Sequence, residues 1–213
     1  VVVATGATWR RDGFGRTDRA LVPGADRSNV YTPDDIMNGA EPEGPVIVFD
    51  DDHYYMGSVI SERLRALGRE VVLVTPEAVA SAFTTYTLEQ SRVQARLMEA
   101  GIRIVASHSL VSIGSDVAEL RCTYTDRVSS IACTSLVLVT ALTANDGLYT
   151  DLVQTAAADG DGGPRRIVRI GDCYAPGTIA AAVWSGHRCA REPFSEITDE
   201  VPFKLERVEL VDG

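Results

Sequence analysis

An α/β fold with a parallel sheet is predicted by three stretches of this sequence. Val46–Phe49 and Val71–Val74 are short apolar runs, and between them, over residues 56–67, apolar residues recur at helical spacing. Ser135–Thr140 is a third apolar run, and its lack of alternation is typical of a strand that is buried on both faces. A strand, a helix and a second strand in this order are the usual beginning of a Rossmann-like FAD- or NAD(P)-binding fold.

Composition and charge set the broad class. The chain has 213 residues, of which 45% are hydrophobic and 23% are charged, so we expect a packed core. Its net charge of −10 argues against nucleic acid or an anionic membrane as a partner. No apolar run approaches the ~20 residues that span a bilayer, and no signal peptide is visible. The four cysteines are widely spaced, which indicates free thiols in a reducing cytoplasm and no metal or cluster site.

The first forty residues contain a strand, a long connection and a short helix. Val1–Ala4 is predicted to be a strand, and residues 7–31 form the connection with Trp9 as its large apolar anchor. Thr32 and Pro33 are typical of a helix start, and Gly39 ends that helix. Because a strand needs sheet neighbours, an apolar strand at residue 1 indicates a piece cut from a longer polypeptide.

An antiparallel insert is expected in the middle of the chain. It follows a short helix or loop after Thr75, an amphipathic helix over residues 87–100 and a strand at Ile102–Ala106. Alternating apolar and polar residues then predict a β-meander with one solvated face, formed by Leu110–Gly114, Val117–Tyr124 and Val128–Cys133.

The remaining elements suggest one domain inserted into another. We expect a helix at Leu148–Ala158, a loop at Asp159–Pro164, a strand at Ile167–Ile170, a helix at Pro176–Arg191 and an alternating tail at Val201–Leu210. A complete NAD(P)-binding-like domain with the meander would then cover residues 41–146. Residues 1–40 and 147–213 would form an incomplete C-terminal half of an ADP/FAD-binding-like domain.

Two short motifs frame the predicted inserted domain. Ala4-Thr5-Gly6 follows the first strand, and Gly171-Asp172 follows the strand after residue 166. This order resembles flavoprotein reductases with two dinucleotide-binding domains, where an ATG strand end precedes the NAD domain and a GD strand end follows it. The resemblance makes Ala4, Thr5, Gly6, Gly171 and Asp172 the candidate cofactor-binding residues. If ADP takes the place of FAD, Asp172 has the alternative role of capping the following helix.

Longer stretches resemble one family more closely. ATGATWRRDG at 4–13, VFDDDHYYMG at 48–57 and IGDCYAPGTIAAAVWSGHR at 170–188 resemble the C-terminal part of the trimethylamine, dimethylamine and histamine dehydrogenases, histamine dehydrogenase above all. These are old-yellow-enzyme-like flavoproteins related to 2,4-dienoyl-CoA reductase. The resemblance implies FMN and a [4Fe–4S] cluster in the parent protein only, possible ADP in the flanking half-domain, and an electron-transferring flavoprotein and a second subunit as partners.

The turn after Val46–Phe49 lacks the glycines that bind a dinucleotide. Aligned on this strand, the three glycine positions fall on Asp50, Asp52 and Tyr55. Two carboxylates would face the diphosphate, and like charges near ~4 Å repel by about 4 kcal/mol at an effective dielectric of ~20. This corresponds to roughly a thousandfold in affinity, so NAD(P) binding is not expected.

Other polar and aromatic residues have more ordinary interpretations. Asp50–His53 is interpreted as a hydrogen-bonded, solvated turn rather than a metal site, and no catalytic base is assigned. We expect packing roles for Trp9, Trp184, Tyr54 and Tyr55, solvated loops for Arg10-Arg11 and Arg165-Arg166, a loop position for His108 and a helix surface for His187.

The favoured hypothesis is a non-catalytic, nucleotide-binding-like segment of an amine-oxidising iron–sulfur flavoprotein. One alternative is a segment of an NAD(P)H-dependent reductase of the 2,4-dienoyl-CoA reductase type. Another is a structural or docking module. The identity of the amine and the electron acceptor are not encoded in this stretch.

Overall fold

The computed structural model describes residues 1–159 and 166–191. The chain forms two compact units, which are described separately: unit 1 contains residues 1–7 and the chain from residue 144 onward, and unit 2 contains residues 8–143. The chain therefore passes between the units twice. The crossing strands β2 (Ala7–Trp9) and β11 (Leu142–Ala144) pair with each other as a two-stranded ribbon.

Unit 2 is organised around a five-stranded parallel sheet. Its strands are β3 (Val30–Tyr31), β10 (Ser135–Val139), β4 (Val46–Asp50), β5 (Val71–Val74) and β6 (Arg103–Val105), in this spatial order. All four neighbouring pairs are parallel. The three strands predicted from uninterrupted apolar runs are completely buried, which confirms that a parallel sheet is covered on both faces.

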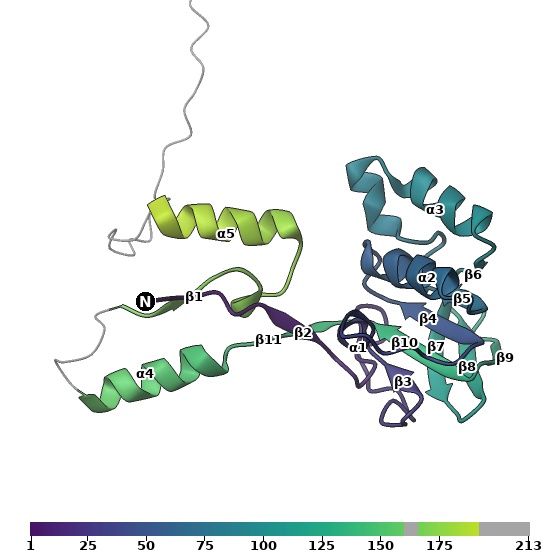
Figure 1. The fold of residues 1–213 in the computed structure, drawn as a ribbon, viewed down its shortest axis with the longest axis horizontal. Coiled ribbons are helices and arrows are strands. Elements are labelled where there is room, and N and C mark those ends of the chain that lie inside the picture. The colour runs from purple at the N-terminus through teal and green to yellow at the C-terminus, as the bar shows by residue number, and fades with distance from the viewer. Residues whose placement is uncertain (160–165, 192–213) are drawn as a thin grey trace, which may run out of the picture. The chain divides into compact units, whose positions relative to one another are not determined.

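Helices cover one face of this sheet, as Figure 1 shows. They are α1 (Pro33–Met37), α2 (Met56–Ala66) and α3 (Gln90–Glu99), and the short 3₁₀ helix η1 (Ala82–Thr87) precedes α3. Alternate strand residues such as Val48 and Leu73 share one core with Ile60 of α2 and Leu97 of α3. Thr32 caps α1 through a reciprocal capping box with Asp35, as its position before Pro33 predicts.

A three-stranded antiparallel sheet covers the other face. It contains β7 (His108–Ile113), β8 (Val117–Cys122) and β9 (Val128–Ala132), in that spatial order. The other set of alternate residues, including Phe49 and Val74, packs there against Leu110 and Leu120. This sheet lies where the meander is expected. His108 differs from its predicted loop position, because it opens β7.

In unit 1, a strand at the start of the chain pairs with a strand that comes after unit 2 in the sequence. β1 (Val2–Val3) is parallel to β12 (Val168–Arg169), and the other elements are α4 (Gly147–Asp159), the 3₁₀ turn η3 (Gly171–Cys173) and α5 (Ile179–Arg191). None of the helix α5 residues is buried. The predicted loop at Asp159–Pro164, except Asp159, and the predicted tail at Val201–Leu210 lie outside the described residues.

The division of the chain differs from the expected one between residues 8 and 40. The sequence analysis assigns them to the flanking half-domain, whereas the structure groups them with unit 2. The physical reason is that β3 pairs with β10, and Ile36 of α1 is fully buried in the helix-side core. A two-residue strand with so few apolar neighbours gives little signal of this sheet pairing in the sequence.

Candidate functional site

The carboxyl edge of the parallel sheet contains the first candidate site. The chain moves from β4 to β5 on one side, while β10 pairs with β4 on the other side. This reversal of strand order is the topological switch point at which open α/β sheets bind ligands. The turn that follows β4, starting at Asp50, lies at this point and is joined to β10 because the amides of Asp51 and Asp52 both donate to the carbonyl of Val139.

Asp50 is directed into the protein interior beneath the first turn of α2. Its side chain is completely buried, with Oδ1 accepting a 3.0 Å hydrogen bond from the amide of His53, while Oδ2 has no partner. A Cβ atom placed on Gly57 would lie 2.5 Å from that Oδ2, so only glycine permits this approach. Burial raises the pKa of Asp50 to about 7, because the charged form loses its hydration.

Asp51 is held by a loop that crosses the carboxyl edge. We call residues 13–18 the strap. The amide of Thr17 in the strap donates to Asp51 Oδ2 at 3.0 Å, and its hydroxyl donates to Oδ1 at 2.6 Å. A Cβ atom on Gly15 would overlap the Asp51 carboxylate, so the strap lies directly on it. Arg121 of β8 secures the far end of the strap through a 3.1 Å ion pair with Asp18.

His53 completes the buried cluster from the other side. Its Nε2 lies 3.1 Å from Asp51 Oδ1, its ring contacts Phe83 edge-on, and its backbone adopts a left-handed φ of 65°. Burial alone would lower the pKa of His53, but the hydrogen bond to Asp51 and the charges of nearby carboxylates outweigh it and raise the pKa. The buried Asp51–His53 pair therefore favours the imidazolium form.

The residues at the outer part of the turn are less buried. Asp52 forms a 3.3 Å ion pair with Arg16 of the strap. Desolvation raises the pKa of Asp52 despite the opposing effect of Arg16. Tyr54 and Tyr55 pack against each other with ring centroids 4.3 Å apart, in agreement with the packing interpretation.

This geometry corrects the interpretation of Asp50–His53 as a solvated turn. Asp50, Asp51 and His53 are each at most 2% exposed, because helix α2 covers Asp50, the strap covers Asp51, and Phe83 of the 3₁₀ helix packs on His53. Gly57 allows helix α2 to pack closely on strand β4. The strap was not predicted from the sequence, although two glycines around Phe14 in an otherwise charged loop were a usable signal.

The second candidate site lies in unit 1, at the carboxyl ends of β1 and β12. Because these strands are parallel neighbours, the motifs that follow them lie at one edge. The Thr5 hydroxyl donates to the Asn145 carbonyl and lies 3.2 Å from Cys173 Sγ. The Gly6 carbonyl accepts a 2.9 Å hydrogen bond from the amide of Asn145. The structure thus brings the two predicted motifs together, with Asn145 and the buried Cys173 between them.

Gly171 and Asp172 shape the entry to helix α5. Gly171 has a φ of 58°, and its amide donates to Ser185 Oγ of α5 at 3.0 Å. Asp172 Oδ1 accepts a 3.2 Å hydrogen bond from the amide of Gly177, two residues before α5 begins. Ala4 is exposed. The alternative role of Asp172 as the cap of α5 is not what this contact provides, because Gly177 lies in the loop, and the amide of Ala181 in the first turn of α5 donates to Thr178 Oγ1.

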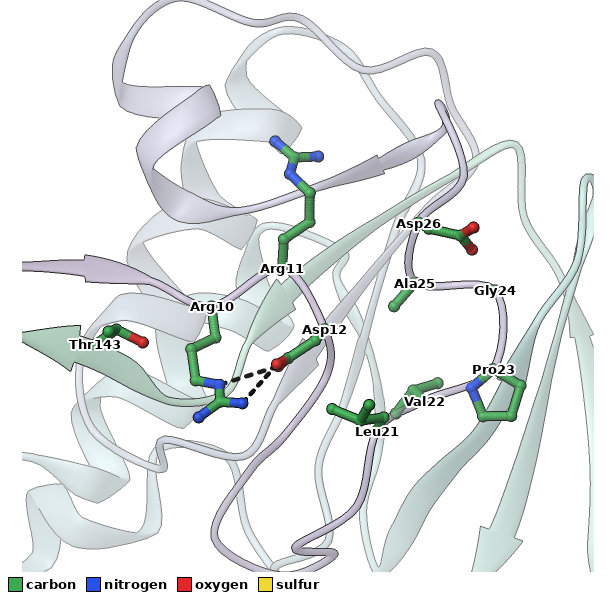
Figure 2. Close-up of a pocket in the computed structure, with 10 residues that line it drawn as sticks. All are labelled: Arg10, Arg11, Asp12, Leu21, Val22, Pro23, Gly24, Ala25, Asp26 and Thr143. Carbon is green, nitrogen blue, oxygen red and sulfur yellow. Dashed lines mark hydrogen bonds and ion pairs between the residues drawn. The ribbon is translucent and has the colours of Figure 1, made fainter.

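An open depression with a volume of about 780 Å³ lies elsewhere in unit 2, as Figure 2 shows. Its arginines are already paired within the protein. Arg10 contacts both carboxylate oxygens of Asp12, and Arg11 donates to the carbonyl of Val30 at 2.6 Å and pairs with Asp35. These carboxylates cancel the charge that an anionic ligand would need, so we assign no site to this depression.

The other singled-out residues have mixed outcomes. Trp9 packs against the helix-side core as predicted, whereas Trp184 is 56% exposed on α5 with Arg188 over its ring. Arg165 lies outside the described residues, and Arg166 is exposed. Across residues 1–159 and 166–191, no group of three or more His, Cys, Asp or Glu side chains is arranged to hold a metal ion. Within the same residues, no helix is both long and apolar enough to cross a membrane.

The fold and the switch point define the class of domain, and comparison with known proteins agrees with it. Residues 31–132 match the family model of the OYE-like second alpha/beta domain. The thioredoxin reductase of Lactococcus lactis, at 18% identity and a TM-score of 0.63, shares the fold over 91% of this chain and 64% of that one. Unit 2 therefore contains a match to the OYE-like second alpha/beta domain.

More similar relatives specify the family. Dimethylamine dehydrogenase of Hyphomicrobium sp. (strain x) is 27% identical over 97% of this chain and 31% of its own length. Histamine dehydrogenase from Rhizobium sp. 4-9 is 38% identical, with a TM-score of 0.90 over 99% of this chain and 33% of that one. The 6-hydroxypseudooxynicotine amine oxidase of Pseudomonas geniculata N1 is 40% identical, with a TM-score of 0.85 over 91% of this chain and 29% of that one.

Nearly the whole chain is therefore similar to a segment of dimethylamine dehydrogenase and of histamine dehydrogenase, which confirms the resemblance seen in its motifs. It spans about a third of the length of the relatives it matches.

Proposed function

We propose that this chain is the nucleotide-binding-like, non-catalytic part of an amine-oxidising flavoprotein. The parent protein would be a cytoplasmic oxidoreductase that holds FMN and a [4Fe–4S] cluster outside this segment, forms a dimer and passes electrons to an electron-transferring flavoprotein. The similarity to two amine dehydrogenases supports this class. The four free cysteines agree with a reducing compartment.

One observation carries the proposal for this segment: the strap occupies the switch point of unit 2. A dinucleotide-binding domain needs that edge open, so that backbone amides can approach the pyrophosphate. Here the amide of Thr17 is engaged by the buried Asp51 carboxylate, and the amides of Asp51 and Asp52 donate to the Val139 carbonyl. The Asp52 carboxylate adds negative charge beside this position. Unit 2 would then serve as a scaffold without bound NAD(P)H.

Unit 1 is the proposed place for ADP. Its motif residues Thr5, Gly6, Gly171 and Asp172 lie at one strand edge before helix α5, and the amino end of a helix favours a phosphate. The Asp172 carboxylate, already hydrogen-bonded to Gly177, would orient the loop that receives the diphosphate.

Calorimetric titration of the 213-residue chain with NADH, NADPH and ADP tests both parts. We expect no binding of either nicotinamide cofactor up to about 1 mM. For ADP we expect binding that Asp172→Ala weakens at least tenfold, whereas Asp151→Ala on the exposed face of α4 leaves it unchanged. Micromolar NADPH binding would support the reductase alternative instead.

The reductase alternative has one further support, since 2-naphthoyl-CoA reductase shares the fold over 88% of this chain with a TM-score of 0.64. The closed switch point argues against it. The third possibility, a docking module, is compatible with a scaffold role. Removing residues 45–145 from the parent and measuring dimer formation and acceptor reduction separately would test it, and unchanged values for both would exclude a docking role.

A further inference from the structure

The strap is fastened by groups that can lose protons. The Asp51 carboxylate receives the amide and the hydroxyl of Thr17 from the strap, and it receives His53 Nε2 from the turn after β4. The carboxylate of Asp51 therefore joins the strap to the turn after β4, although Thr17 and Asp51 are 34 residues apart in the chain. The strength of this junction depends on whether His53 carries a proton, since a charged donor forms a stronger hydrogen bond than a neutral one.

Asp50 lies on the same turn and is poorly suited to a charge. Its Oδ1 accepts one amide hydrogen bond, its Oδ2 is buried without a partner, and Gly57 is packed against it. An ionised carboxylate in this place lacks the hydrogen bonds that would replace water, whereas a neutral carboxyl group is tolerated there. Burial accordingly raises the pKa of Asp50 to about 7.

The surrounding charges are mostly negative. Asp51 and Asp52 lie on the same turn, and Glu77 faces His53 from the segment after β5. The balancing cations are His53 itself and Arg16 of the strap, whose side chain is 53% exposed. Loss of protons from Asp50 and His53 would thus leave as many as four carboxylates beside one partly solvated guanidinium, a repulsive arrangement at low dielectric.

We propose that the Asp50–His53 turn is a proton-operated latch for the strap. With Asp50 neutral and His53 charged, the strap is closed over the carboxyl edge between β4 and β10. When both groups are deprotonated, the Asp51–His53 ion pair is lost and the Asp50 charge needs water. The Asp50 charge also repels the neighbouring Asp51 carboxylate, and lifting the strap lets water reach Asp51. The strap is the part of the cover that can lift, because it is a loop, whereas Asp50 itself lies beneath helix α2.

Hydrogen exchange of single backbone amides, followed by NMR on the full chain between pH 5.5 and 8.5, tests the latch. Between pH 6 and pH 8 we expect the protection factor of the Thr17 amide to fall about tenfold or more, as loss of one to two protons requires. The amide of Ala100, which donates to Arg96 at the end of α3, serves as the reference and should not change. Asp50→Asn should retain the protection at pH 6 and abolish most of its fall at pH 8.

The proposal would be overturned if the protection factor of the Thr17 amide had the same pH dependence in Asp50→Asn as in the unaltered chain. It would also be overturned if this protection factor did not change with pH in the unaltered chain. If Asp50→Asn does not fold, the carboxyl ¹³C shift of Asp50 in the unaltered chain decides instead. A protonation step of Asp50 between pH 6 and 8 is required, and a carboxylate that stays ionised throughout this range would refute the latch. Asp26→Asn, an exposed acid of the same unit, is the matched control and should leave every curve unchanged.

Discussion

The Thr17 hydroxyl donates a 2.6 Å hydrogen bond to Asp51 Oδ1, and the Thr17 amide donates to the same carboxylate. This double contact fixes the strap to a side chain that is only 1% exposed. Removing a hydrogen-bond donor from a buried carboxylate destabilises the folded protein, because water does not replace the lost donor.

Thr17→Val therefore should lower the free energy of unfolding by about 1–3 kcal/mol. Valine keeps the shape of threonine but cannot donate to Asp51. Urea denaturation at constant pH measures the loss. Thr17→Ser retains the hydroxyl and should recover most of it; equal losses in the two variants would show that the methyl group, not the hydrogen bond, is responsible.

Gly57→Ala should be destabilising, although alanine favours helices. The added Cβ would lie 2.5 Å from Asp50 Oδ2, so helix α2 or β4 must shift at a cost of about 1–3 kcal/mol. Gly186→Ala in α5 is the matched control, because no heavy atom lies within 4 Å of its added Cβ. Thermal unfolding should show Gly186→Ala unchanged or stabilised by up to about 1 kcal/mol. A neutral Gly57→Ala would mean that the helix is not held against Asp50.

Stability should fall as the pH rises toward neutrality. The pKa of Asp50 is about 7 in the folded state and 3.8 as its ordinary value, so its proton is bound more tightly when folded. The resulting stabilisation is complete below about pH 4 and is lost as the pH rises through 7. A pKa difference of roughly three units corresponds to a stabilisation on the order of 4 kcal/mol. His53, whose pKa is also raised, contributes in the same direction, with stability lost above its folded pKa.

Unfolding free energies of Asp50→Asn at pH 5 and pH 8 check this prediction. The difference between the two pH values should be smaller than in the unaltered chain, and the variant should be the more stable protein at pH 8. Asp26→Asn should keep the original difference. An unaltered chain that gains stability from pH 5 to pH 8 would contradict the assigned state of Asp50.

The cysteines should differ in reactivity. Burial raises the pKa of Cys133 to about 11, whereas hydrogen bonds, first of all with Thr125, lower the pKa of the half-buried Cys122. Because the thiolate is the reactive form, iodoacetamide at pH 8 should label Cys122 well before Cys133. Peptide mass spectrometry over time gives the order, and simultaneous labelling would indicate that β9 and the loop after it open readily.

The sequence predicted the sheet better than it predicted the site. Uninterrupted apolar runs such as Val46–Phe49 indicate buried strands, because no other element of that length needs both faces covered. The acidic turn was correctly located but wrongly described as solvated. Its burial comes from the strap and from the segment containing Phe83, which are separated from it by about thirty residues of chain, and local patterns carry no information about such long-range covering.

The candidate residues of unit 1 were assigned on different grounds. Ala4-Thr5-Gly6 and Gly171-Asp172 were assigned from a family resemblance, and parallel pairing of β1 with β12 brings them to one edge. The candidate binding residues did not include Cys173, which follows Asp172 and whose thiol meets Thr5. In a sequence, a buried cysteine cannot be distinguished from other small apolar residues. The contact between Cys173 and Thr5 is therefore visible only in the structure.

The β2–β11 ribbon has a consequence for the order of folding. Val2 and Val168 are paired strand residues, yet unit 2 separates them along the chain. Closing so long a loop in an unfolded chain is slow and entropically costly. Once unit 2 has folded, the amide of Arg10 is bonded to the carbonyl of Ala141, and β2 is paired with β11. This pairing brings together the two chain segments that lead to β1 and toward β12. A mutation that slows the folding of unit 2 should therefore also delay the pairing of β1 with β12 in unit 1.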